Sequence, residues 1–295
     1  LWPMGAEEVA IANAAFPDTP VEHDKTWPEQ VHRLLATSLG LFCIVLVGLA
    51  WRQRRKGING PVKLTLVLLA MVILQGMFGR WTVTLNLWPQ VVTAHLIGGF
   101  TTLSLLWLLT LRLQNRCWQL TPSAFAKIQR LKPLLIVALI LVVGQILLGG
   151  WTSTNYAALA CPDLPTCQGE WWPNMDFSKG FNFSQDIGPN YLGGLMENSA
   201  RTAIHFSHRI GAMVVTITVS YLIYRLLRIK QANVSQWAMM LAIILIVQIS
   251  LGLSNVYWSL PLPVAVAHNA VGALLLLTFV GLCHRFYTAK AVKVD

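Results

Sequence analysis

Seven long apolar runs with few charges constrain this chain more than any other feature of its sequence. A helix needs about 20 residues to cross ~30 Å of hydrocarbon, and only helices or closed barrels satisfy their backbone there. The runs lack the period-two alternation of barrel strands. We therefore expect an all-α polytopic membrane protein. The predicted spans are roughly 33–51, 62–84, 91–111, 133–153, 203–226, 236–258 and 263–284.

The composition supports this class. Charged residues make up 12% of the 295 residues and hydrophobic residues 55%, whereas a soluble domain carries about 25% charged residues. The net charge of +10 does not indicate nucleic-acid binding, because the basic residues cluster between the apolar runs, as in "RQRRKGINGPVK" at 52–63. Membrane topology explains such clusters better.

Basic linkers alternate with linkers that carry little or no positive charge. Lys and Arg are concentrated after the first, third and fifth runs and in the C-terminal tail, while 85–90 and 259–263 carry no charge and 154–202 leans acidic. The positive-inside rule places the basic linkers and the C-terminus in the cytoplasm. Residues 1–31 and 154–202 are then expected outside.

Two segments of the chain repeat without gaps. "QGMFGRWTVTLNLWPQVVTAHLIGG" begins at Gln75, and "QISLGLSNVYWSLPLPVAVAHNAVG" begins at Gln248. "VHRLLA" around His32 likewise matches "SHRIGA" around His208. The chain is therefore predicted to be two copies of one helical unit.

The second copy starts with the span at 133–153, and the first shows no counterpart before His32. Residue 1 is Leu, and no signal peptide is visible. We expect a preceding span and eight spans in all, arranged as two pseudo-symmetric four-helix bundles. The N-terminal half is 32–132 and the C-terminal half is 133–295, with an outer Cys loop at 154–202.

Four histidines occupy matched positions near the outer ends of their spans: His32, His95, His208 and His268. Histidines in or at the membrane default to a functional interpretation. Two imidazoles per half, presented by facing helices, would bind a six-coordinate haem. Glycines after the second His of each half would let a flat ring approach the backbone. Interfacial anchoring is the alternative, and zinc or copper is less favoured because no close-set carboxylates or cysteines accompany the histidines.

Arg33 and Arg209 directly follow the first His of each half. Bidentate pairing with haem propionates suits them, and snorkelling at the interface is the alternative.

The two copies differ three residues before that His, where the first has Glu29 and the second has His205. Glu29 could position a water, move a proton or stabilise cationic charge, or it could simply complement the helix dipole. His205 could support the second haem or serve as a spare ligand. The difference suggests that the two halves perform different tasks.

Cys161 and Cys167 lie close together in "CPDLPTCQGEWWP" within the outer segment. A disulfide is permitted outside the cytoplasm. The short loop favours a reactive bridge, and a plain structural staple is the alternative.

These residues together resemble the haem A synthase family, in its proteobacterial branch. The resemblance is carried by "EQVHR" at Glu29–Arg33, "TAHLIGG" at His95, "CPDLPTCQGEWWP", "HFSHRIGA" at His205–Ala212 and "AHNAVGA" at His268. Their order and spacing run across nearly the whole chain. The first span and an upstream Cys pair found in many members are not seen in this sequence.

The resemblance implies an enzyme that oxidises the C8 methyl of haem O to a formyl, giving haem A for cytochrome c oxidase. It implies that His208 and His268 hold a b-type haem cofactor, that His32 and His95 receive haem O, and that Glu29 acts on the substrate side. It further implies a bacterial inner membrane, with the outer segments in the periplasm, and haem O synthase and cytochrome oxidase assembly factors as partners.

Two other functions also explain paired histidines. One is a bis-haem b electron carrier of the cytochrome b561 type, which passes electrons from quinol, and the other is a haem transporter. Neither explains why Glu29 in one half is replaced by His205 in the other, nor the outer Cys pair. A homo-oligomeric state stays open.

Overall fold

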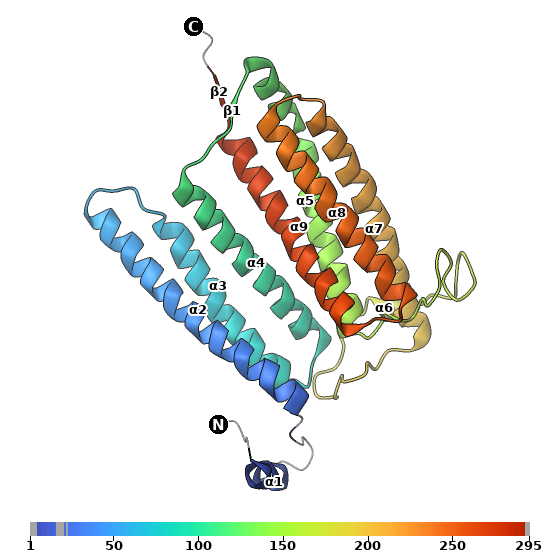
Figure 1. The fold of residues 1–295 in the computed structure, drawn as a ribbon. Helices are drawn as coiled ribbons and strands as arrows, with labels where there is room; N and C mark the ends of the chain where they lie inside the picture. Colours follow the sequence, from blue (N-terminus) through green and yellow to red (C-terminus); the bar gives the residue numbers. More distant parts are fainter. Residues whose placement is uncertain (1–4, 16–20, 22, 293–295) are drawn as a thin grey trace. The chain divides into compact units, whose positions relative to one another are not determined.

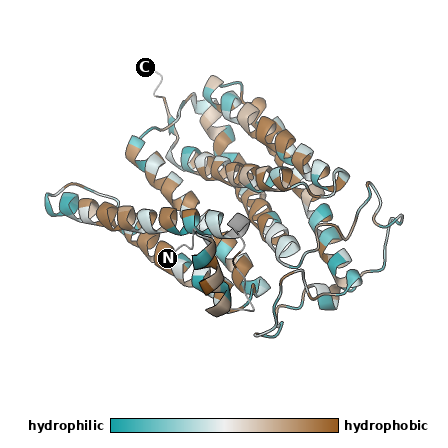
Figure 2. Cartoon of the chain, turned by 60° about the horizontal axis from the view of Figure 1, so that its bottom comes forward, coloured by the Kyte–Doolittle hydropathy of each residue, from teal (hydrophilic) through white to brown (hydrophobic). Residues whose placement is uncertain are grey.

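Each apolar run forms one long helix in the computed structural model, which describes residues 5–15, 21 and 23–292 (Figure 1). Within these ranges, seven helices are long and apolar enough to cross a membrane, and the predicted all-α multi-pass fold is confirmed. Figure 2 shows their hydrophobic middles and more hydrophilic ends. The helices are α1 (Ala6–Ala15), α2 (His23–Arg55), α3 (Val62–Thr84), α4 (Pro89–Gln114), α5 (Pro122–Thr154), α6 (Phe177–Gly180), α7 (Asn198–Leu227), α8 (Ala232–Tyr257) and α9 (Leu262–Thr288).

The helix boundaries follow local chemistry. Proline occupies the first turn of α4, α5 and α9, where its missing N–H has no intrahelical partner to lose. The Thr121 hydroxyl caps α5 by accepting from the Ala124 N–H, and α4 ends at Asn115 in a left-handed conformation. Helix α5 starts eleven residues before the predicted span at 133, because its basic first turns continue the helix beyond the apolar run.

The chain packs as two compact units, Leu1–Gly76 and Met77–Asp295. The first contains α1, α2 and most of α3, and the second contains the remaining elements. This division follows packing, so the predicted halves at 32–132 and 133–295 stay a prediction.

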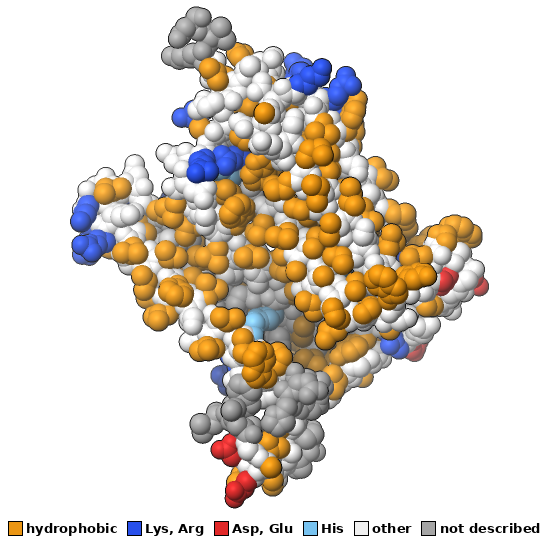
Figure 3. Space-filling view, in the orientation of Figure 1, with side chains coloured by type: hydrophobic (Ala, Val, Ile, Leu, Met, Phe, Trp, Pro, Cys, Tyr) orange, Lys and Arg blue, Asp and Glu red, His pale blue; other side chains and the backbone are white. Residues whose placement is uncertain are grey.

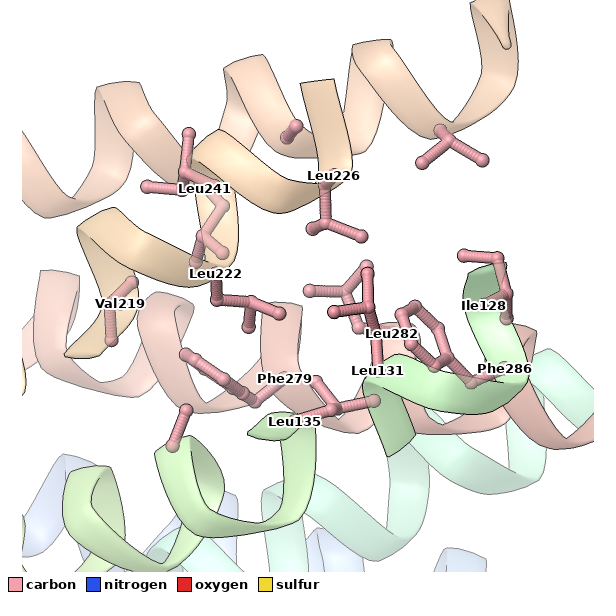
Figure 4. Packing of buried hydrophobic residues seen from close by; sticks show 14 of the residues in the cluster. Ile128, Leu131, Leu135, Val219, Leu222, Leu226, Leu241, Phe279, Leu282 and Phe286 are labelled. Carbon is pink, nitrogen blue, oxygen red and sulfur yellow. The ribbon is translucent and has the colours of Figure 1, made fainter. Parts of the chain in front are cut away.

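The second unit is built around a ring of four helices. Helix α5 packs on α7, α7 on α8, α8 on α9 and α9 on α5, and α4 packs on α5 and α9. Within the described residues, α7 and α9 are diagonal in this ring, as are α5 and α8. Figure 4 shows how the side chains fill the middle. The labelled residues are Ile128, Leu131, Leu135, Val219, Leu222, Leu226, Leu241, Phe279, Leu282 and Phe286.

The internal repeat is visible in the turns that precede α4 and α9. The Leu87 N–H donates to Thr82 O at 2.9 Å, and the Leu260 N–H donates to Asn255 O at 2.7 Å. Both leucines have positive φ, 62° and 64° respectively. The same turn therefore places the helix that follows in both copies.

The two ends of this second unit differ in charge. A two-residue parallel pairing of β1 (Gln119–Leu120) with β2 (Lys290–Ala291) joins the α4–α5 connection to the C-terminal segment. On the face shown in Figure 3, Lys and Arg gather at this end, while hydrophobic side chains cover the flanks of the helices. The acidic-leaning segment between α5 and α7 lies at the other end (Figure 1).

Candidate functional site

Two of the predicted ligands lie on diagonal helices of the ring. His208 is on α7 and His268 is on α9, each toward the end that carries the α5–α7 segment. Both rings are at least partly buried. The other diagonal, α5 and α8, presents an amide and a glycine to each ring.

Gln145 of α5 holds His208. Its Nε2 lies 3.0 Å from Nδ1 of the ring and donates to the His208 carbonyl oxygen at 2.9 Å. One amide group therefore contacts both the ring and the backbone of the same histidine. This double contact limits how far the imidazole can rotate.

Gln248 of α8 takes the matching position against His268. Its Nε2 lies 3.3 Å from Nε2 of the ring. Nδ1 of His268 is buried without a hydrogen-bond partner, and so are the Oε1 atoms of Gln145 and Gln248. Buried polar atoms are rarely left in this state, so each site retains unmet hydrogen-bonding capacity, at the amide oxygen of both sites and also at the ring of His268.

Glycines make room for the rings. A Cβ at Gly149 would lie 3.2 Å from Cε1 of His208, and a Cβ at Gly252 would lie 3.1 Å from Cε1 of His268. A Cβ at Gly79 would lie 3.2 Å from Cε1 of His95. Three histidines therefore pack in the same way on a glycine of a neighbouring helix. We call Gly79, Gly149 and Gly252 the glycine seats of these rings.

The N-terminal pair is divided between the two compact units. His32 lies on α2 in the first unit and His95 on α4 in the second. Their pairing around a substrate stays a prediction from the repeat. The pattern around His95 matches that around His268, which supports equivalent use of the two histidines.

The residue three before each first histidine pairs with the arginine that follows it. Oε1 of Glu29 accepts from Nη2 of Arg33. In the second copy, Nε of Arg209 lies 3.4 Å from Nε2 of His205. The same contact between residues four apart therefore occurs in both halves, with a carboxylate in the first and an imidazole in the second.

Arg209 also binds the Cys loop, here defined as residues 161–169. Its Nη2 donates to Cys161 O at 2.7 Å and its Nη1 donates to Thr166 O at 2.8 Å. Nδ1 of the buried His205 accepts from the Cys161 N–H at 3.3 Å. The predicted disulfide between Cys161 and Cys167 is present. The residues on either side of His208 therefore attach α7 to this loop, and the propionate role of Arg209 stays a prediction.

Asp163 organises the Cys loop from within. Its carboxylate accepts from the Thr166 hydroxyl and from the N–H groups of Gln168 and Gly169. The Thr166 hydroxyl and then the Gly169 N–H lower the pKa of Asp163 below its ordinary value. Such bonds favour the ionised carboxylate. The Asp163 carboxylate therefore links Thr166, Gln168 and Gly169 when it is ionised.

The segment that follows is fixed to the bundle by tryptophans. The Trp151 Nε1–H donates to Gly180 O at 2.8 Å, and the Trp88 Nε1–H donates to Gln185 O at 3.1 Å. Lys179 forms an ion pair with Glu197. The outer segment thus closes over one end of α4, α5 and α7.

The donor set at α7 and α9 fits a haem. Two imidazoles are a sufficient axial set for a six-coordinate iron, whereas the described ranges hold no cluster of three or more His, Cys, Asp and Glu residues that could bind a metal ion. The glycine seats and unpartnered polar atoms lie at the same rings. The residues present therefore suit a flat iron macrocycle.

Sequence reasoning missed the roles of Gln145, Gly149 and Gly252. The available signal was a Gln-x-x-x-Gly pattern that occurs at Gln75, Gln145 and Gln248. It also missed that Arg209 donates to loop carbonyls, because backbone acceptors leave no signature in residue types.

The fold and site define an α-helical multi-pass membrane protein that presents a pair of histidines from diagonal helices of a four-helix ring. The profile of the COX15-CtaA family, described as cytochrome oxidase assembly protein, matches residues 1–280. The chain belongs to this family.

Three proteins similar to this chain carry the same name. It is 42% identical over 278 residues to the Heme A synthase of Shewanella oneidensis, covering 94% of this chain and 82% of that protein. It is 24% identical over 280 residues to the Heme A synthase of Halalkalibacterium halodurans, covering 94% and 83%. It is 29% identical over 254 residues to that of Rhizorhabdus wittichii, covering 84% and 68%.

Proposed function

We propose that this chain is a haem A synthase, an oxidoreductase that converts haem O to haem A for cytochrome oxidase assembly. The observation that carries the proposal is 42% identity, across 94% of the chain, to a protein named Heme A synthase. The histidine pair on α7 and α9, with its glycine seats, supplies a physical reason for haem chemistry.

The reaction proposed is oxidation of the C8 methyl of haem O to a formyl by successive hydroxylations. Written as a half-reaction, the methyl group and one water give the formyl group, four protons and four electrons, and the electrons pass to an external acceptor. Glu29 is the proposed catalytic residue, and its contact with Arg33, which directly follows the proposed ligand His32, supports this role. A carboxylate held there can orient a water or accept a proton near the reacting carbon.

The two halves are proposed to bind different haems. His208 and His268 would hold a resident b-type haem, and His32 and His95 would hold haem O during the reaction. The b-type haem would supply one-electron redox chemistry. Arg33 and Arg209 are proposed to support propionates, and His205 supports the second site by holding the Cys loop through Cys161.

The proposed location is the bacterial inner membrane, with the C-terminus in the cytoplasm and 1–31 and 154–202 in the periplasm. The basic end at β1 and β2 supports this orientation. Haem O synthase and cytochrome oxidase assembly factors are the proposed partners, and the Cys161–Cys167 bridge is proposed to be redox-active.

The haems that copurify with the protein test this proposal. From cells that make haem O, the purified protein should contain haem B together with haem O or haem A. His208→Ala and His268→Ala should each remove haem B, whereas His284→Ala, at the other end of α9, should not.

Two equivalents of haem B and no haem O or haem A would instead indicate an electron carrier. Unchanged haem B in both ligand variants would contradict the assignment of the cofactor site.

A further inference from the structure

Three helices of this chain share a Gln followed four residues later by Gly, at the same distance from the helix end. Gln75, Gln145 and Gln248 each lie nine residues before the last residue of α3, α5 and α8. Because residues four apart share a helix face, the Gln and the Gly of each helix can both contact the same neighbouring helix. On α5 and α8 that neighbour carries a candidate haem ligand.

The helices interlock at these positions. The ring of His208 packs over Gly149, and the amide of Gln145 lies beside Gly211, where a Cβ would collide with Oε1. At the second site, a Cβ at Gly272 would lie 3.5 Å from Nε2 of Gln248. Each amide therefore sits in space left by a glycine about one turn after the histidine it contacts.

The amides have an unused acceptor at each site. Oε1 of Gln145 and Oε1 of Gln248 are buried and have no hydrogen-bond partner. An imidazole that binds iron through one ring nitrogen carries its proton on the other, and that proton needs an acceptor. The amide faces Nδ1 of His208 at the first site and Nε2 of His268 at the second. A side-chain amide offers both a donor and an acceptor, so it can satisfy a ring nitrogen in either protonation state.

We propose that Gln145 and Gln248 are positioning residues that fix the imidazole orientation of His208 and His268 and accept their ring N–H when they ligate haem iron. Gly149 and Gly252, the glycine seats, let the two rings lie close to α5 and α8. This inference rests on the proposed ligand role of the two histidines, and it assigns the groups that tune that role.

Substitution of the amide by an apolar group of similar size tests the inference. Gln145→Leu or Gln248→Leu in the full chain should weaken the affinity for haem B by about 10- to 100-fold. Losses of this size are typical when a group that hydrogen-bonds to a metal ligand is removed. Loss of the acceptor makes the imidazole a weaker donor, so the midpoint potential of the remaining haem should rise. The electron paramagnetic resonance g values of the oxidised haem should also shift, because they follow ring orientation.

Gln145→Glu keeps an acceptor oxygen in either protonation state. It should restore haem content and return the potential to the wild-type value or below. Gln129→Leu, four turns earlier on α5, is the matched control and should leave haem content, potential and g values unchanged.

The glycine seats give a second test that does not depend on the amide. Gly149→Ala should displace the His208 ring and shift the g values. Gly144→Ala, on the same helix, has open space around its Cβ position and should not shift them.

The outcomes separate this inference from the proposed function. Gln145→Leu and Gln248→Leu proteins with wild-type haem content, potential and g values would overturn the inference, while loss of haem B in His208→Ala would still support the ligand assignment. Haem B retained in His208→Ala would overturn both. An intact Cys161–Cys167 disulfide and an unchanged elution volume show that each variant is folded.

Discussion

At the scale of single residues, the two copies differ in the charge of the side chain three positions before the first histidine. Glu29 and His205 each lie three residues before a histidine of the motif. Glu29 contacts Arg33 and His205 contacts Arg209, the arginine that follows that histidine in each copy. The sequence predicts this exchange from the repeat alone. It does not predict that Arg209 binds Cys161 O and Thr166 O, because carbonyl acceptors depend on how the loop folds.

Asp163 gives a pH prediction at this scale. Its folded-state pKa is lowered from 3.8, so its contribution to loop stability is present above about 3.8 and is lost as the pH falls through the lower folded value. Reduction of the Cys161–Cys167 disulfide by a phosphine should therefore be slow at pH 7 and accelerate at pH values below about 3.8. Asp163→Asn should be reduced faster at pH 7 and show little of this acid dependence. Equal rates for the two proteins at pH 7 would contradict the role of the carboxylate.

Arg209 gives a second residue-scale prediction. Its guanidinium makes two charge-assisted hydrogen bonds to loop carbonyls, each worth about 1.5–3 kcal/mol. Arg209→Met should release the Cys loop and speed its cleavage in limited proteolysis. Arg201→Met is the matched control on α7, because the Arg201 side chain donates to no loop carbonyl among the described residues, and its Nε has no hydrogen-bond partner there. Slow cleavage in Arg209→Met, equal to wild type, is the contrary result.

At the scale of elements, the spans follow directly from residue types, because every backbone group in hydrocarbon must be paired within its helix. The contacts between helices do not follow so directly. Gln145 and Gly149 acquire a role only because α5 packs on α7, and the sequence shows the repeated pattern without showing which helix it faces.

The bundle core gives a prediction for this scale. Leu135 is fully buried in the cluster of Figure 4, whereas Val137 on the same helix is 50% exposed. Leu135→Ala should lower the free energy of unfolding in mixed micelles by about 2–5 kcal/mol, the range for a cavity left by Leu. Val137→Ala removes a side chain that faces lipid and should change it by much less. Similar losses for both variants would show that this face of α5 is not packed as described.

At the scale of the whole molecule, charge asymmetry is the basis of the proposed orientation. The C-terminal segment pairs with the basic α4–α5 connection, and the 154–202 segment lies at the other end of the second unit. The sequence predicts this alternation from Lys and Arg alone. The proposed substrate ligands His32 and His95 lie in different units, so packing within either unit does not determine their pairing.

Reporter fusions test the orientation. Alkaline phosphatase inserted between 183 and 190 should be active, because it would fold in the periplasm. The same reporter after residue 292 should be inactive, while a fluorescent protein placed there should fold and emit. The opposite pattern at both positions would reverse the proposed topology.

The central claim is that this chain oxidises haem O through a site in which Glu29 carries the chemistry. The most direct measurement is the haem composition of membranes from cells that make haem O and express either the wild-type chain or Glu29→Ala. We predict haem A with the wild-type chain and only haem O with the variant, at equal protein levels. Haem A at wild-type levels with Glu29→Ala would contradict the role of this carboxylate, and no haem A with the wild-type chain would contradict the proposed activity itself.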